Sequence, residues 1–202
     1  MQYSTVERDF VKRTLILLKQ YDQYVIPKTG ADDRYEVTLL LNCLLGLIVL
    51  PFEYSKREQS EPQYPQVVLN NEIQISEVSS SWGLANIQIF RLKLDGKKVQ
   101  PQELTFRKMI ALTRHRIAHA QFEDGGGQKK PRGLSVTYGV DKNNPIESMI
   151  LQVNFVNEYR NKVEFEASIP VDDLRIFACM VAEWFLSRLE NKVSKSKVNA
   201  SV

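Results

Sequence analysis

The spacing of the apolar residues changes along the chain, and this change limits the folds that the sequence can adopt. Apolar residues recur at helical period in segments 4–25, 33–50 and 101–123. Between residues 134 and 169 they alternate with polar residues, and many are β-branched, which is typical of strands. Helical spacing returns from Pro170 onwards. We therefore predict a mainly α-helical bundle with a small antiparallel β-meander inserted before the last helix.

The meander is predicted to have strands at residues 134–140, 149–157 and 161–169. Residues 82–94 fit a helix or a strand equally well. The polar segment 53–80 contains Pro62 and Pro65, so we expect a long connection there. A short strand or helical turn is expected within it, around residues 67–75.

The most apolar stretch, residues 37–52, is expected to be a helix in the protein core. It is shorter than the roughly 20 residues that a membrane-spanning helix needs, and it contains Asn42 and Gly46. Its apolar residues lie nearly all round the helix, so we expect a central position in the bundle. Thr38 and Asn42, one helical turn apart, are expected to form a buried polar pair, and support of an active site is the alternative.

Composition indicates an ordinary globular protein of the cytoplasm. Hydrophobic residues are 43% and charged residues 25% of the 202 residues, which argues against a disordered chain. The two cysteines, Cys43 and Cys179, lie in apolar runs and provide no disulfide framework, as is usual in a reducing compartment. The N-terminal residues are charged and lack the apolar core of a signal peptide. We therefore expect a cytoplasmic protein with no membrane partner.

The net charge of +3 is concentrated near the C-terminus. Segment 188–202 carries four basic residues and one acidic residue, so its excess equals the net charge of the whole chain. We predict a single domain over residues 1–192 and a flexible basic tail over residues 193–202. Within the neutral remainder, residues 107–132 hold seven basic and two acidic residues. This local excess favours an anionic ligand such as RNA at that segment.

The only two histidines of the chain, His115 and His119, lie four residues apart and share one face of a predicted helix. Three interpretations fit this pair. Histidines at this spacing can bind zinc, but the sequence HRIAH lacks the Glu of zinc peptidases and no cysteine cluster adds ligands. Histidines near a helix end can instead stabilise the helix through its dipole. In the third interpretation, histidines transfer protons and arginines hold a phosphate, as metal-free RNA cleavage requires.

Residues 114–119, Arg-His-Arg-Ile-Ala-His, resemble the signature of the HEPN superfamily. That signature is an arginine, a polar residue, a few further residues and a histidine, and Arg114, His115 and His119 occupy these positions. The opening stretch, from STVERDFVKRTL to YEVTLLLNCLLGLIVLP, also resembles that of a bacterial HEPN-family nuclease group. The resemblance covers residues 3–52 and 104–123, and it does not extend to the meander.

The resemblance implies a helical bundle that forms a homodimer, with the motif helices facing each other across a composite active site. It implies a metal-independent endoribonuclease that needs no cofactor and leaves 2′,3′-cyclic phosphate ends on its RNA substrate. His119 would act as general base or acid, Arg114 would hold the scissile phosphate, and His115 would orient the pair or contact the phosphate. A role as a toxin or an anti-phage defence effector, with an antitoxin or defence-system partner, is also implied.

Four further basic residues are candidates for RNA binding: Arg116, Lys129, Lys130 and Arg132. The alternative for them is a solvated charged loop. The rival function is a non-catalytic RNA- or nucleotide-binding module, or the partner subunit of a two-component system. A metal-dependent hydrolase is a third interpretation.

Overall fold

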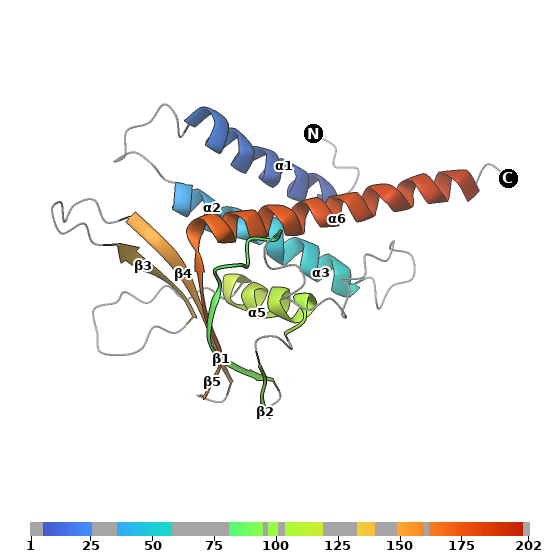
Figure 1. The fold of residues 1–202 in the computed structure, drawn as a ribbon. Coiled ribbons are helices and arrows are strands. Elements are labelled where there is room, and N and C mark those ends of the chain that lie inside the picture. Colours follow the sequence, from blue (N-terminus) through green and yellow to red (C-terminus); the bar gives the residue numbers. More distant parts are fainter. Residues whose placement is uncertain are drawn as a thin grey trace. The chain divides into compact units, whose positions relative to one another are not determined.

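The helices and strands of the chain fall into two compact units, which are described separately. The computed structural model describes residues 6–25, 36–57, 81–94, 97–100, 104–118, 133–139, 149–159 and 162–199 (Figure 1). Residues 1–69 and 178–202 form the helical unit, and residues 70–177 form the sheet unit. Helix α6 (Val171–Asn199) begins in the sheet unit and ends in the helical unit.

The helical unit contains the first two predicted helices. α1 (Val6–Gln20) continues into a π-helical turn, η1 (Tyr21–Val25), as the spacing of residues 4–25 predicts. α2 (Glu36–Leu44), the π-helical η4 (Leu45–Val49) and α3 (Leu50–Arg57) follow one another directly. Burial of their apolar side chains stabilises the unit. The fully buried side chains include Val11, Leu18, Leu40, Leu44, Leu47 and Ile48.

The second helical segment runs past its predicted end at residue 50, to Arg57. The sequence predicts an end near Pro51 because proline lacks the N–H that an interior helical turn uses. In η4, however, the N–H of Leu50 bonds to the carbonyl of Leu45, five residues back. The regular ladder of hydrogen bonds is therefore already replaced where Pro51 follows, and the chain stays helical through the proline.

One side of α2 and η4 is exposed, although the sequence predicts a helix covered nearly all round. Thr38 and Asn42 are exposed, so the predicted buried polar pair is wrong. Leu45, on the same side of the helix, is 48% exposed. An apolar pattern cannot distinguish a helix covered on every side from one with an open strip, because apolar residues also occur at the surface. In the described residues, no helix is both long and apolar enough to cross a membrane.

Gly46 lets η4 approach α1 closely. A Cβ atom at this position would lie 2.6 Å from Oγ1 of Thr14 and 2.9 Å from a ring carbon of Phe10. The Thr14 hydroxyl donates to the Phe10 carbonyl at 2.8 Å, which keeps the hydroxyl at this point of contact. The absence of a side chain at Gly46 is therefore a packing requirement of the helical unit.

The last helix, α6, begins where the sequence predicts, with Asp172 and Asp173 in its first turn. Carboxylates stabilise that end of a helix because the backbone dipole is positive there. In the helical unit, Glu183 of α6 pairs with Lys19 of α1 at 2.6 Å. The helix reaches Asn199 and so extends into the segment that is expected to be a flexible tail. The predicted domain boundary at residue 192 stays a prediction.

The sheet is larger than the predicted meander. β3 (Gly133–Gly139), β4 (Met149–Tyr159) and β5 (Lys162–Pro170) pair antiparallel in sequence order, as predicted. β1 (Gln88–Leu94) pairs with the other edge of β5, and β2 (Lys97–Lys98) pairs with β1. The described strands therefore form a five-stranded sheet in the order β2-β1-β5-β4-β3. The prediction of a small meander is wrong because β1 and β5 are distant in sequence, and local alternation carries no sign of such a pairing. The strand or turn expected around residues 67–75 lies outside the described residues.

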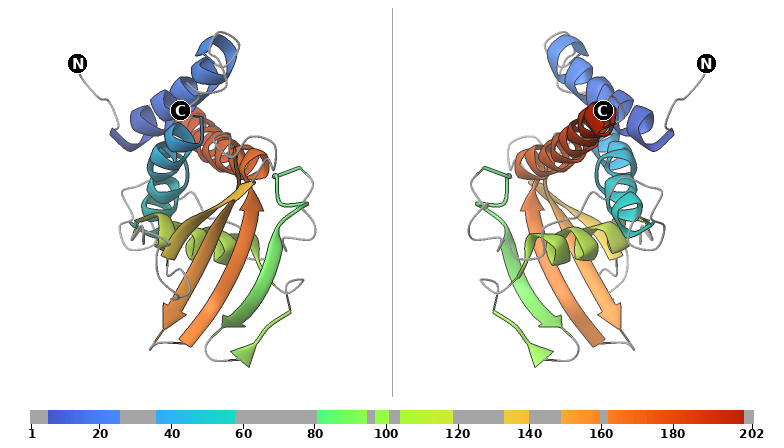
Figure 2. Two further views of the ribbon diagram at one scale, coloured as in Figure 1. Left: turned by 90° about the vertical axis from the view of Figure 1, so that its left-hand side faces the viewer. Right: turned by 90° about the vertical axis from the view of Figure 1, so that its right-hand side faces the viewer.

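The two faces of the sheet differ in character. In β4, Val153, Phe155 and Asn157 are buried on one face, and helix α5 (Phe106–Ala118) lies across that face (Figure 2). The alternate residues of β4, such as Asn154, face the other side. One face of the sheet thus packs against helix α5, and the other face does not.

A tight turn holds the start of α6 in the sheet unit. Gly83 has a φ of +68°, and a Cβ atom there would lie 2.3 Å from the carbonyl oxygen of Asp173. The Asn86 side chain donates to Oδ2 of Asp173 at 3.0 Å. Beside this turn, the ring of Trp82 meets Phe106 of α5 edge-on, with 4.4 Å between centroids. Gly83 is therefore required for two reasons: its φ is positive, and a side chain would collide with the Asp173 carbonyl.

Candidate active site

Helix α5 carries the Arg-His motif, and its cap sets where the helix starts. Oγ1 of Thr105 accepts a hydrogen bond from the Lys108 N–H at 3.3 Å, which is the contact of an N-cap residue. The helix therefore begins at Phe106, later than the start predicted from residue 101, and Leu104 precedes it. The prediction placed the start on a proline, whereas the threonine side chain provides the cap.

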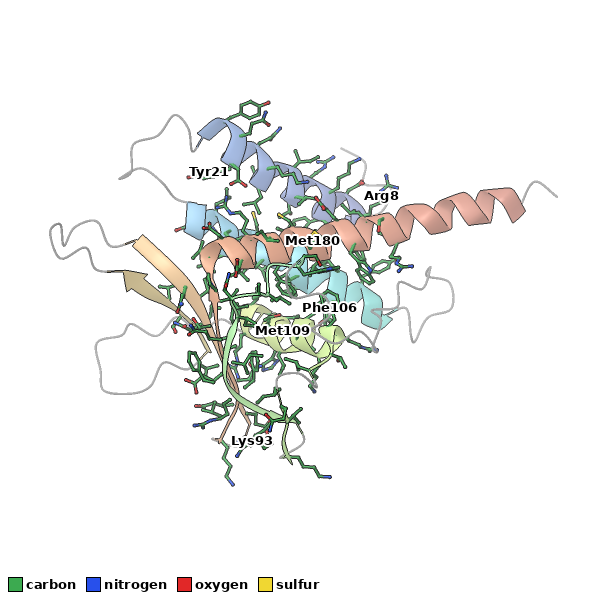
Figure 3. The ribbon with its side chains drawn as sticks, viewed as in Figure 1. Arg8, Tyr21, Lys93, Phe106, Met109 and Met180 are labelled. Atoms are coloured by element: carbon green, nitrogen blue, oxygen red, sulfur yellow. The ribbon has the colours of Figure 1, made fainter. Side chains whose placement is uncertain are left out.

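The buried face of α5 sets the orientation of the motif. Thr113 is fully buried, and its hydroxyl donates to the carbonyls of Met109 and Ile110 at 3.0 and 3.1 Å. Figure 3 labels Phe106 and Met109 on this helix. The buried residues recur at helical spacing: Phe106, Met109, Ile110, Thr113 and Ile117.

Asn157 of β4 ties the motif end of α5 to the sheet. Its Nδ2 donates to the Leu112 carbonyl at 3.0 Å, and its Oδ1 accepts a hydrogen bond from Nε of Arg116. Asn157 is 7% exposed, so both halves of a buried amide are satisfied by one turn of α5. We call this set, Leu112, Arg116 and Asn157, the amide clamp.

The position of Arg116 is half-buried, and burial lowers the pKa of its guanidinium because a charge loses hydration there. The carboxylate of Glu158 acts in the opposite direction and raises the pKa. Glu158 offsets only part of the desolvation of the cation, and Asn157 accepts a hydrogen bond from it. The sequence predicts an RNA contact for Arg116, which stays a prediction. In the structure, Arg116 donates a hydrogen bond to Asn157 within the sheet unit.

Arg114 and His115 lie on other sides of the helix from Arg116. His115 is exposed, and Arg114 is half-buried. Successive residues of a helix are turned by about 100°, so Arg114 and Arg116 project in nearly opposite directions. The predicted catalytic His119 and the predicted RNA contacts Lys129, Lys130 and Arg132 lie outside the described residues.

Asn157 is a residue that the sequence reasoning missed, although a signal was present. In β4, Val153 and Phe155 occupy the face that the alternation assigns to the core, and Asn157 continues that register. A polar amide at a core position requires hydrogen-bond partners. The break in the apolar pattern at Asn157 therefore indicates that its amide bonds to another element. The pattern does not identify that element.

Over the described ranges, no group of three or more His, Cys, Asp or Glu side chains is arranged to hold an ion. Cys43 is buried and Cys179 is partly exposed. The chemistry that this end of α5 offers is that of cations and an imidazole.

A protein-family model described as HEPN pEK499 p136 matches residues 1–192 of the chain. The match covers the sheet unit, with the whole of α5, and the helical unit up to residue 192. No curated protein and no solved structure gives a significant match.

Proposed function

Because the chain belongs to the HEPN pEK499 p136 family, we propose that it is a metal-independent endoribonuclease that cleaves RNA by attack of the 2′-hydroxyl. Membership indicates a nuclease-like or RNA-related function at the level of the superfamily. The observation that carries the finer proposal is the Arg-His-Arg-Ile-Ala-His sequence at residues 114–119, on the last turns of α5 and directly after them.

The reaction needs a base for the 2′-hydroxyl proton, an acid for the leaving 5′-oxygen, and positive charge at the phosphate. Histidine suits both proton transfers because its pKa lies near neutral pH. Arginine suits the phosphate because its planar guanidinium stays charged and forms paired hydrogen bonds. We assign Arg114 to the scissile phosphate and His119 to proton transfer. His115 orients the pair or contacts the phosphate, and the products carry 2′,3′-cyclic phosphate ends.

A single motif offers few groups for two proton transfers, so the proposal includes a homodimer in which two motifs face each other. The biological role that goes with this activity is that of a cytoplasmic toxin or anti-phage effector, restrained by an antitoxin or defence-system partner. The rival is an RNA- or nucleotide-binding module that has the fold but no cleavage activity.

The test is incubation of the protein with RNA in the presence of EDTA. Cleavage should survive the chelator, leave 2′,3′-cyclic phosphate ends, and fall by about 10²-fold or more in Arg114→Ala and His119→Ala. Lys108→Ala is the matched control, since it removes a cation at the opposite end of α5. RNA binding without cleavage would favour the rival, and activity that EDTA abolishes would favour a metal-dependent hydrolase.

A further inference from the structure

The hairpin of β1 and β2 gathers exposed cations at one edge of the sheet. Lys93 lies directly opposite Lys98, so their side chains leave the same face of the sheet. Arg91 is two residues from Lys93 on β1, and Lys97 is opposite Leu94 on β2. All four basic side chains are exposed. In Figure 3, Lys93 points away from α5.

A hollow of about 320 Å³ lies on this hairpin. Arg91, Lys93 and Lys98 are among the residues that line it, and no carboxylate is among the described lining residues. Like charges placed directly opposite each other repel, and an anion between them removes that cost. The hollow therefore suits a phosphate by charge.

Lysines also protect edge strands from pairing with other chains, and this would account for Lys97 and Lys98 on β2. It does not account for Phe90, which is on an inner strand and is 62% exposed. The register of β1 against β5 shifts between Ile89 and Arg91, so the strand bulges at Phe90. A large apolar ring thus stands in water beside three cations, and it lines the same hollow.

Phe90 also lines a second hollow, of about 300 Å³, whose charge is opposite. Glu158, Glu166 and Asn154 contribute to its walls, and no basic residue is among its described lining residues. Glu166 lies opposite Arg91 in the sheet, so the two hollows meet at this pair of strands. Carboxylates repel phosphates but accept hydrogen bonds from the amino groups of bases.

We propose that the hairpin of β1 and β2 is a contact site for single-stranded RNA, with a base stacked on Phe90 and phosphates held by Arg91, Lys93 and Lys98. Stacking on an aromatic ring combined with a basic groove is the usual way in which proteins hold single strands. Glu166 accepts from the amino group of the stacked base, which favours cytosine over uracil. The site shares its ligand class with the proposed ribonuclease, so its role as a substrate contact rests on that function, whereas binding of single-stranded RNA at the hairpin does not.

The test is fluorescence anisotropy of the full chain with labelled 2′-O-methyl oligocytidylate of about 12 nucleotides, across a range of salt concentrations. This probe cannot be cleaved through its 2′-oxygen. Lys93→Ala combined with Lys98→Ala should lower affinity about tenfold at low salt and reduce the salt slope by about 1.4, the value for two phosphate contacts. Phe90→Ala should lower affinity about tenfold at every salt concentration and leave the slope unchanged. All of these side chains are exposed, so the variants should fold.

Lys162→Ala is the matched control, because Lys162 is an exposed cation of the same sheet that lines neither hollow. Its affinity should equal that of the wild type. The affinity ratio of oligocytidylate to oligouridylate should fall towards one in Glu166→Ala. Equal losses in Lys162→Ala, unchanged binding in the hairpin variants, or equal binding of polyglutamate without dependence on Phe90 would overturn the proposal. Cleavage without hairpin-dependent binding would refute this site alone, and hairpin-dependent binding without cleavage would refute the proposed ribonuclease alone.

Discussion

Asn157 shows how a single side chain can determine the geometry of a motif on another element. Its amide bonds to Leu112 and Arg116, which are one turn apart on α5. The amide clamp therefore resists both unwinding of this turn and rotation of the helix on the sheet. Arg116, which lies between the two motif histidines in sequence, is the residue through which the clamp acts.

Asn157→Leu should destabilise the chain by about 1–3 kcal/mol, because it leaves a half-buried guanidinium and a carbonyl without this partner. The measurement is urea-induced unfolding. The control is Asn154→Leu on the same strand, where the amide lies on the other face and its Nδ2 is 3.5 Å from Oγ of Ser135. That variant should lose less than about 1 kcal/mol. Equal losses of unfolding free energy in the two variants would show that the amide clamp does not stabilise the chain more than an ordinary surface amide does.

The two cysteines should react at different rates. Burial raises the pKa of the Cys43 thiol, and the side chain is 4% exposed. The thiolate is the reactive form, so a raised pKa moves the labelling of Cys43 to higher pH. In the native protein, iodoacetamide should modify the partly exposed Cys179 first, as followed by mass spectrometry of peptides. In denaturant the two rates should converge, and faster labelling of Cys43 in the native state would contradict its burial.

At the scale of elements, the contact of η4 with α1 depends on Gly46. Gly46→Ala would place a methyl group 2.6 Å from Oγ1 of Thr14, so the helices must separate or shift. We expect a loss of about 1–3 kcal/mol in the free energy of unfolding. Thr14→Ala removes the atom that clashes, and the ring of Phe10 is exposed enough to move aside. The double variant should therefore be more stable than Gly46→Ala alone. Additive losses would show that the two residues do not meet.

The elements that follow from the sequence are those whose signal is local. The helical stripe of residues 4–25 and the alternation of residues 149–157 each report which face is buried, because that face repeats within a few residues. The sequence left residues 82–94 undecided, because β1 is defined by its pairing with β5 and by a bulge at Phe90. Exposure of Asn42 likewise depends on which surfaces other elements cover, and no local period contains that information.

The candidate site divides in the same way. The Arg-His-Arg-Ile-Ala-His sequence identifies the motif by residue type alone. The amide clamp could not be predicted from this sequence, because Asn157 contacts α5 only in the folded chain. The hairpin cations could not be predicted either, because strand register alone places Lys93 opposite Lys98. Strand β4 of the sheet thus has a structural use, because its Asn157 bonds to the motif-bearing helix α5.

For the whole molecule, the proposed composite site makes a prediction about mixed subunits. If two motifs complete one active site, an inactive chain should inactivate the active chain with which it pairs. Wild-type protein mixed with an excess of His119→Ala should then lose activity per wild-type chain, in proportion to the wild-type fraction. With the same excess of Lys108→Ala chains, which carry an intact motif and are themselves active, the activity per intact motif should stay unchanged.

The measurement is RNA cleavage by mixtures in which exchange of subunits is followed by energy transfer between labelled chains. Activity per wild-type chain that stays constant while exchange proceeds would show that one protomer holds a complete site. That outcome would refute the composite dimer. The proposed roles of Arg114 and His119 would stand, because a complete site within one chain still needs both groups. The dimer and the chemistry of the motif are therefore separable, and the mixing experiment tests the dimer alone.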